Sequence, residues 1–133
     1  MIRLAVLPIA SLALGLMLLP ALAGDQGDTR QNGTAKVTLW SHAFLSEDEL
    51  AMLRMVQTND QALAIFVPDN KGFAAMAVSP DDGFLRDGQP VASAIAIAGL
   101  PDAQTATKNA LAACNQSRKG KKPCVLVLAV EPG

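Results

Sequence analysis

The chain contains two cysteines, and their placement restricts its fold more than any other feature of the sequence. Cys114 closes a helix-like run that begins at Ala103, and Cys124 opens a strand-like run that ends at Val130. In a protein exported to an oxidising compartment, such a pair is expected to form a disulfide. Nine residues separate the two cysteines, unlike the C-x-x-C spacing of redox enzymes, so we expect a structural bond. The sequence therefore predicts a helix clamped to the strand that follows it.

The first 23 residues have the features of a secretory signal peptide. Arg3 supplies a positive charge, an apolar run covers residues 4–19, and Ala21 and Ala23 match the small residues of a cleavage site. The alternative is an uncleaved membrane anchor, but the run is short for a span of about 20 apolar residues. We predict cleavage after Ala23, export to the periplasm and no transmembrane span in the mature chain.

The charge of the mature chain, residues 24–133, argues against binding to nucleic acid. It carries ten basic and twelve acidic residues, a formal net charge of −2. A general nucleic-acid binder needs a broad basic face that neutralises several phosphates. The mature chain also has a single tryptophan and no tyrosine, so it offers few rings on which a flat cofactor could stack. We expect no nucleic-acid partner and no cofactor.

The polar start of the mature chain, residues 24–35, contains glycines and lacks periodicity. We expect it to form a flexible arm that precedes a single domain over residues 36–133. Within that domain, the stretch 36–44 is rich in strand-forming residues and predicts a short strand.

The clearest local signal in the chain is the start of a helix at Ser46. Ser46 and Glu49 match a capping box, and Leu45 and Leu50 are placed as a hydrophobic staple. The helix is expected to end near residues 58–60. Its apolar residues form one core-facing stripe: Leu50, Leu53, Val56 and Met52.

A near-repeat follows this helix, in residues 64–73 and 75–84. Each half is an apolar run followed by Pro-Asp and a glycine, which are typical of turns. One interpretation is a hairpin that pairs residues 62–67 with residues 73–78. The alternative extends the first helix into Ile65 and leaves the second run alone as a strand.

The last part of the chain alternates strand and helix patterns. Residues 85–90 resemble a loop, and residues 91–98 form an apolar run typical of a strand. Asp102 is placed to cap a helix over residues 103–116, and the run 124–130 is suited to an interior strand. The whole pattern predicts an α+β fold: a small, mainly antiparallel sheet of three to five strands, with two helices packed on one face and one disulfide.

Two segments resemble parts of small exported alphaproteobacterial proteins of unknown function. These segments are AMAVSPDDG, residues 75–83, and ALAACNQSRKGKKPCVLVL, residues 110–128. The chain is also distantly similar to bacterial domains of unknown function of the type numbered 4189. The resemblance covers about residues 44–130 and implies a periplasmic family without an assigned activity. Some such proteins carry the label 5-aminolevulinate synthase, but a domain this small has no room to enclose pyridoxal phosphate.

The loop between the cysteines is the candidate binding surface. Its four basic residues could meet anionic lipid headgroups or an acidic envelope protein. Because both ends of the loop are expected to be pinned, less entropy would be lost on binding. The residues of this candidate anion-binding surface are Arg118, Lys119, Lys121 and Lys122.

A catalytic site is the rival hypothesis. Ser41 and His42 could combine with an aspartate from a turn, at Asp69 or at residues 81–82, in a small hydrolase or lyase. No nucleophile-elbow motif accompanies them. The same turns lack the spaced carboxylates of a calcium loop, and with one histidine the chain cannot assemble a zinc site from soft ligands. We therefore expect no metal and favour a non-catalytic binding or envelope-assembly module.

Overall fold

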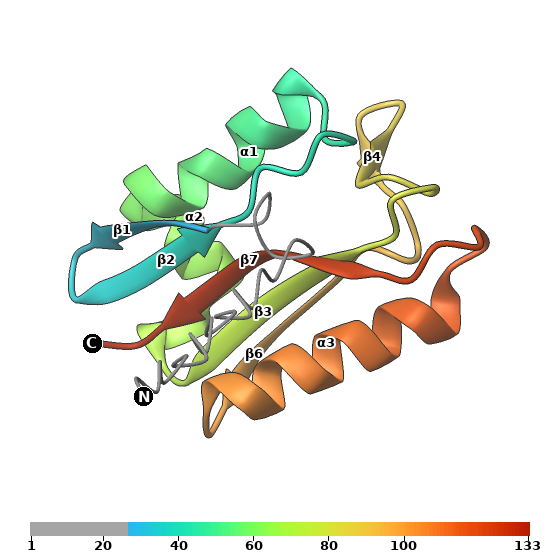
Figure 1. Cartoon of the computed structure of the whole chain (residues 1–133). Helices are drawn as coiled ribbons and strands as arrows, with labels where there is room; N and C mark the ends of the chain where they lie inside the picture. The colour runs from blue at the N-terminus through green and yellow to red at the C-terminus, as the bar shows by residue number, and fades with distance from the viewer. Residues whose placement is uncertain (1–26) are drawn as a thin grey trace, which may run out of the picture.

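The computed structural model describes residues 27–133, so the predicted signal peptide lies outside the described residues. Its centre is a five-stranded sheet in the order β1-β2-β7-β3-β6, in which all neighbouring strands are antiparallel (Figure 1). These strands are β1 (Asp28–Asn32), β2 (Ala35–Leu39), β3 (Phe73–Val78), β6 (Ile95–Leu100) and β7 (Val125–Glu131). The expected class, a mainly antiparallel α+β fold with one disulfide, is confirmed.

Helices cover both faces of the sheet. Figure 1 shows α1 (Glu47–Thr58) and α2 (Asp60–Phe66) on one side and α3 (Ala103–Ser117) on the other. The α1–α2 pair connects β2 to β3 and α3 connects β6 to β7, so each connection passes over one strand. This arrangement differs from the expectation that both predicted helices share one face.

The face under α1 and α2 has a core of large aliphatic side chains. Leu53 and Val56 of α1 and Leu63 of α2 are buried against the sheet. The sheet contributes alternate residues, as the pleat requires. Those residues include Val37 and Leu39 of β2, Ala74, Met76 and Val78 of β3, and Leu128 and Val130 of β7.

The face under α3 is built from small residues. Ala106, Ala110 and Cys114 recur every four residues along α3, so they lie on one side of the helix. They pack against Ala75 and Ala77, the β3 residues that point away from the other core. Small side chains on both elements let the helix lie close to the sheet, where it contacts β3, β6 and β7.

The helix start predicted at Ser46 is confirmed. The Ser46 hydroxyl accepts a bond from the Glu49 amide, and the Glu49 carboxylate accepts one from the Ser46 amide. Asp102 likewise caps α3, where its carboxylate accepts a bond of 2.7 Å from the Thr105 amide. Met52 departs from the expected core-facing stripe, because its side chain is largely exposed.

The interpretation of residues 62–67 as a strand is wrong, and the helical alternative is nearer to the structure. Asn59 ends α1 in an extended conformation, and its side chain then caps α2 by accepting a bond from the Ala62 amide. Leu63 buries the apolar side of this second helix. A run of six apolar residues does not distinguish a strand from a short helix, and the asparagine cap decides in favour of the helix.

The expected flexible arm is wrong for residues 28–35, which form β1 and the turn into β2. Side chains from α1 and β1 bind this hairpin to the domain. Gln57 donates to the carbonyl oxygens of Asp28 and Val37, and Asn32 donates to the carbonyl oxygen of Val56. The segment is polar because it is an outer strand, so polarity alone was a poor guide to order.

The remaining elements are short. After α2, a single 3-10 turn, η2 (Pro68–Asn70), leads into β3. The segment expected to be a loop contains a small separate hairpin of β4 (Leu85–Arg86) and β5 (Gln89–Pro90). The strand expected at residues 91–98 begins only at Ile95 and continues to Leu100.

Candidate functional site

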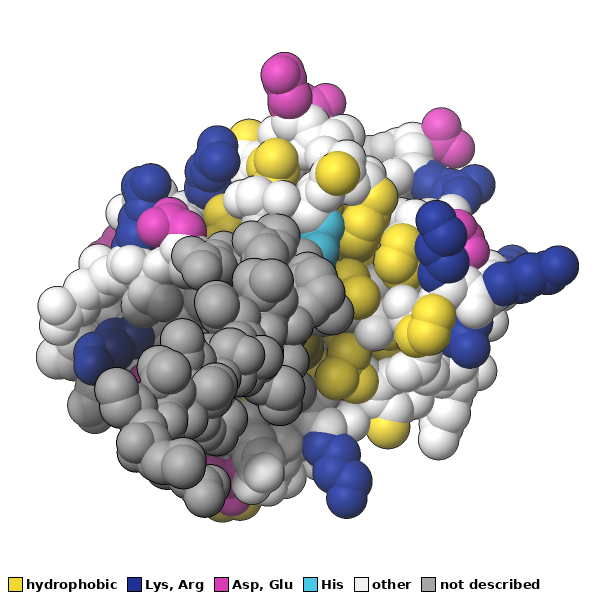
Figure 2. Space-filling view, in the orientation of Figure 1, with side chains coloured by type: hydrophobic (Ala, Val, Ile, Leu, Met, Phe, Trp, Pro, Cys, Tyr) yellow, Lys and Arg dark blue, Asp and Glu magenta, His cyan; other side chains and the backbone are white. Residues whose placement is uncertain are grey.

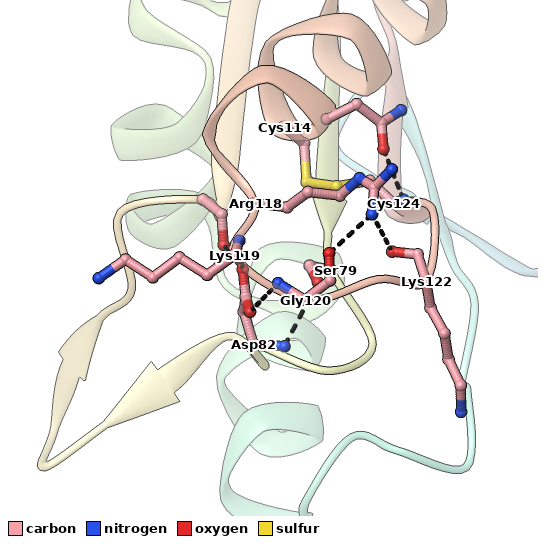
Figure 3. The surroundings of a disulfide bond; sticks show 10 residues. Ser79, Asp82, Cys114, Arg118, Lys119, Gly120, Lys122 and Cys124 are labelled. Atoms are coloured by element: carbon pink, nitrogen blue, oxygen red, sulfur yellow. Dashed lines mark hydrogen bonds between the residues drawn. A yellow bond between two sulfur atoms is a disulfide. The ribbon is translucent and has the colours of Figure 1, made fainter.

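The loop that joins α3 to β7, here called the basic loop (residues 118–122), is held at both ends. The predicted disulfide is present between Cys114, in the last turn of α3, and Cys124, just before β7 (Figure 3). The Cys124 amide also donates a bond of 2.9 Å to the side-chain oxygen of Asn115. The loop therefore leaves the helix and enters the strand at fixed points.

Two neighbouring carboxylates hold the middle of the basic loop. Asp82 accepts bonds of 2.8 Å and 2.9 Å from the amides of Lys119 and Gly120 (Figure 3). Asp81 accepts bonds of 3.0 Å and 3.1 Å from the amides of Lys121 and Lys122. The acidic turn, residues 81–83, thus binds the backbone of the basic loop and leaves the lysine ammonium groups out of these bonds.

Hydrogen bonds to Asp82, one carboxyl of this turn, favour its charged form. The bond from the Lys119 amide is the main reason that the pKa of Asp82 lies below its ordinary value, although partial desolvation opposes it. The Ser93 hydroxyl, which donates to Asp82 at 2.9 Å, and the Gly120 amide act in the same direction. A side chain at Gly120 would collide with Asp81, so glycine is needed for this close approach.

The four basic residues of the loop differ in their roles. Arg118 is half-buried and its guanidinium turns back onto the loop, where it donates to the carbonyl oxygen of Gly120 at 2.7 Å (Figure 3). It therefore stabilises the loop, whereas the sequence interpretation placed it on the anion-binding surface. The side chains of Lys119, Lys121 and Lys122 are exposed.

Positive charge gathers at this end of the molecule. Figure 2 shows several Lys and Arg side chains projecting where the α3–β7 turn and the β4 hairpin lie in Figure 1, with acidic side chains among them. Between the two segments is a cleft of about 360 Å³. Its lining includes Arg86, Lys119, Ser93, Ser117 and Asp82. Across residues 27–133 the single ion pair joins Arg30 to Asp28, so the loop lysines are not neutralised by such a pair.

The residues of the rival catalytic hypothesis have structural contacts. His42 Nε2 lies 2.8 Å from the carbonyl oxygen of Leu126, and its ring stacks on Phe44 with centroids 5.4 Å apart. Ser41 is exposed in the segment after β2. Asp69 lies in η2 with a left-handed backbone, φ 59°, while the carboxylates of the acidic turn bind the basic loop.

In the part of the chain that the structure describes, no three side chains of His, Cys, Asp or Glu are grouped so that they could hold an ion. The oxygens of the acidic turn already accept bonds from backbone amides. The second acidic turn, at Asp69, has no such cluster around it within the described residues.

The sequence interpretation missed an apolar groove beside α1 and α2, with a volume of about 610 Å³. Its rim carries three large exposed side chains, Met52, Met55 and Ile65, which are 46%, 51% and 83% exposed. Beneath them the groove is lined by buried residues such as Leu53, Met76 and Leu128 and, on the far side, by Phe84, Pro90, Ala94 and Ala96. A clue was available, because Met55 and Ile65 fall outside the core-facing stripes of their helices, although Met52 was assigned to the stripe of α1.

Comparison with known protein families, with curated proteins and with solved structures finds no match for this chain. In residues 27–133, every helix is too short or too polar to cross a membrane.

Proposed function

We propose that this protein is a non-catalytic binding module of the bacterial periplasm, which attaches to anionic lipid headgroups through its basic loop. The observation that carries the proposal is the display of Lys119, Lys121 and Lys122. Their side chains are exposed, while their backbone amides are held by Asp81 and Asp82. The lysines therefore project from a fixed base, so that ordering of the loop on binding costs little entropy.

The chemistry of the loop suits a charged surface more than a single deep site. Ammonium groups act as hydrated point charges on flexible stems and need no fixed partner geometry. Each basic residue near an anionic membrane contributes about 1 kcal/mol. Three such residues would support weak, salt-sensitive attachment rather than permanent anchoring. The bonds that occupy Asp81 and Asp82, and the bond from His42 to Leu126, favour this function over a hydrolase or lyase.

Vesicle sedimentation tests the proposal. The exported protein is mixed with vesicles of phosphatidylglycerol and phosphatidylcholine or of phosphatidylcholine alone, at low and at high salt. We expect binding to the anionic vesicles only, with loss at high salt because screening shortens the reach of the charges. The triple variant Lys119→Gln, Lys121→Gln, Lys122→Gln should bind roughly 100-fold more weakly, since three contributions of about 1 kcal/mol are removed.

A matched control separates the loop from net charge. The variant Lys36→Gln, Arg54→Gln, Lys108→Gln removes the same three charges from exposed positions elsewhere. It should retain binding to the anionic vesicles. Equal losses in the two triple variants, or an absence of binding by the unmodified protein, would contradict the proposal. The variant His42→Ala should bind like the unmodified protein, whereas loss of a hydrolytic or lyase activity in it would support the catalytic rival.

The location is tested by intact-mass measurement. If the leader is removed after Ala23, the protein recovered from the periplasm begins at Gly24. A full-length mass in the membrane fraction would instead identify an uncleaved anchor.

A further inference from the structure

The two outer strands of the sheet differ in how they are protected. β1 carries Asp28 and Arg30, which form an ion pair of 2.9 Å, and side chains of α1 and β1 bind the two elements together. Charged residues on an outer strand disfavour pairing with another chain. β6, at the opposite edge, has the sequence IAIAGL and carries no charge.

The uncharged character of β6 extends into its flanks. Residues 88–101 contain no Asp, Glu, Lys or Arg, and this is the longest such stretch in the described part of the chain. Residues 95–97 pair with β3 on one side, and the register shifts before Leu100 pairs again. On the other side of β6, no hydrogen-bond partner from residues 27–133 is found. An open strand edge of this kind is a template for another strand.

The apolar groove adjoins this edge. Ala96 of β6 lines the groove and is exposed, and Ala94 lines it just before the strand begins. On the opposite side lie Met52, Met55 and Ile65, the exposed large hydrophobic side chains of the described residues. The open backbone and the groove therefore form one continuous uncharged surface, here called the β6 surface.

We infer that the β6 surface binds a second copy of this chain, with the two β6 strands antiparallel across a two-fold axis. The absence of charge determines the kind of occupant, since an uncharged edge provides no partner for an acidic or basic segment. Residues 95–98 of a second copy are themselves extended, apolar and uncharged. Two identical edges of this kind meet without like charges opposite each other, and a two-fold contact satisfies both at once.

A stable dimer also requires the groove, because the paired strands alone bury too little surface. A ladder of about four residues alone would bury less than the roughly 800 Å² per partner of a stable interface. A two-fold axis perpendicular to the sheet keeps the α1–α2 faces of both copies on the same side. The two grooves then meet along the β6 pair, and the rims with Met52, Met55 and Ile65 add the missing apolar area. The bulge at Gly99, where φ is 78°, bends the end of β6 and confines pairing to residues 95–98.

Sedimentation velocity of the exported protein over a range of concentrations tests the inference. We expect a dimer at high concentration that dissociates on dilution. The variant Ala96→Lys places a charge on the β6 surface. It should sediment as a monomer, with half the mass of the dimer, at every concentration. The matched control is Ala112→Lys, because Ala112 is exposed on the side of α3 that faces away from the sheet. It should dimerise as the unmodified protein does.

Hydrogen exchange supplies a second measurement that requires no variant. If β6 pairs with β6, the amides of residues 95–98 should exchange at least about tenfold more slowly at high than at low protein concentration. Those of residues 28–32 in β1 should not change. A monomer at all concentrations, an equal effect of both lysine variants, or concentration-dependent protection of β1 instead of β6 would overturn the inference. Dimerisation is independent of the basic loop, so the triple lysine-to-glutamine variant should still dimerise.

Discussion

The two layers of helices on the sheet are built in opposite ways. α3 meets the sheet through alanines and is joined to it covalently by the Cys114–Cys124 disulfide. α1 and α2 meet it through large aliphatic side chains, and α1 is also held by bonds that Glu49 accepts and Gln57 donates. The first layer is closed over β3, β6 and β7, whereas in the second layer α1 lies over β1 and β2, and the apolar groove is left beside α1 and α2.

This difference shows how the size of the packed side chains affects how much of each face of the sheet the helices cover. Alanines permit close approach, so one helix covers three strands on one face. Larger residues fill the face under α1 and α2, where α1 contacts β1 and β2. The buried carboxylate of Glu49 links the start of α1 to the β4 hairpin by accepting bonds of 2.9 Å and 2.8 Å from the amides of Phe84 and Leu85. The open layer thus combines aliphatic packing with polar bonds, and the closed layer combines packing of small residues with a covalent bond.

Of the changes that test this comparison, removal of the disulfide is expected to lower the free energy of unfolding the most. In the double variant Cys114→Ser, Cys124→Ser, the unfolded chain regains the freedom of a loop of about eleven residues, which corresponds to roughly 2.5–3 kcal/mol in the loop-entropy model. Denaturant unfolding measures this loss. Thiol titration of the native protein should find no free thiol. A variant as stable as the unmodified protein would mean that α3 is held by packing alone.

Enlarging an alanine in each layer tests whether the closed layer tolerates extra atoms less well than the open layer. Ala110→Leu places three extra carbons between α3 and the sheet, where Ala110 is fully buried. Overpacking of this kind costs about 1–3 kcal/mol. The control Ala62→Leu adds the same atoms beside the groove, where Ala62 is only half-buried, and should change the free energy of unfolding by less than about 0.5 kcal/mol. Equal costs at the two positions would contradict the distinction between a closed and an open layer.

The open layer should be sensitive to acid through Glu49. Burial raises the pKa of Glu49, but bonds from Ser46, Leu85 and Phe84 outweigh it and hold the pKa below its ordinary value of 4.5. A carboxyl whose pKa is depressed in the folded state stabilises the protein above the unfolded-state pKa. That stability is lost as the pH falls through the folded-state pKa.

The variant Glu49→Gln isolates this contribution. Its side chain keeps a single carbonyl oxygen, so it leaves at least one of the three amides without an acceptor, at a cost of about 1–3 kcal/mol at neutral pH. Thermal melts at several pH values should show a smaller loss of stability below pH 4.5 in the variant than in the unmodified protein. Identical pH dependence in the two proteins would show that Glu49 does not couple α1 to the β4 hairpin.

The smallest effect is expected at the first turn of α1. Ser46→Ala removes the hydroxyl that accepts the Glu49 amide, and loss of such a cap costs about 0.5–2 kcal/mol. The control Ser41→Ala changes an exposed serine outside any helix and should cost less than about 0.5 kcal/mol. Denaturant unfolding compares the two variants. Equal midpoints would show that the Ser46 hydroxyl does not stabilise α1.

Short-range signals in the sequence predicted the corresponding structure well. The capping box at Ser46 and the cap at Asp102 each involve groups three residues apart, so the local sequence contains both partners. The disulfide connects residues only ten positions apart, in the same helix-to-strand turn. By contrast, the sequence left residues 62–67 open between a strand and a helix extension, because a short apolar run can bury one side in either structure.

The candidate site was predicted in part. The basic loop and the acidic turn were both recognised, but as separate features: the loop as an anion-binding surface, and the turn as a source of an aspartate for the rival catalytic site. About 40 residues separate them, and only the fold brings the loop amides onto Asp81 and Asp82. Nothing in the local pattern around Arg118 distinguished its inward side chain from the three exposed lysines. The groove was not anticipated, because its walls come from α1, α2, β3, β7, β6 and the segment before β6.

The sequence by itself determined the elements whose partners are close along the chain: the helix caps, the disulfide turn, the apolar strands and hence the α+β class. The tertiary structure alone decided which face each helix covers, how the acidic turn meets the basic loop, and which sheet edge is left open. The physical reason is the range of the interactions. A cap or a short disulfide loop is specified by neighbouring residues, whereas burial is shared among distant strands and depends on the whole arrangement of the chain.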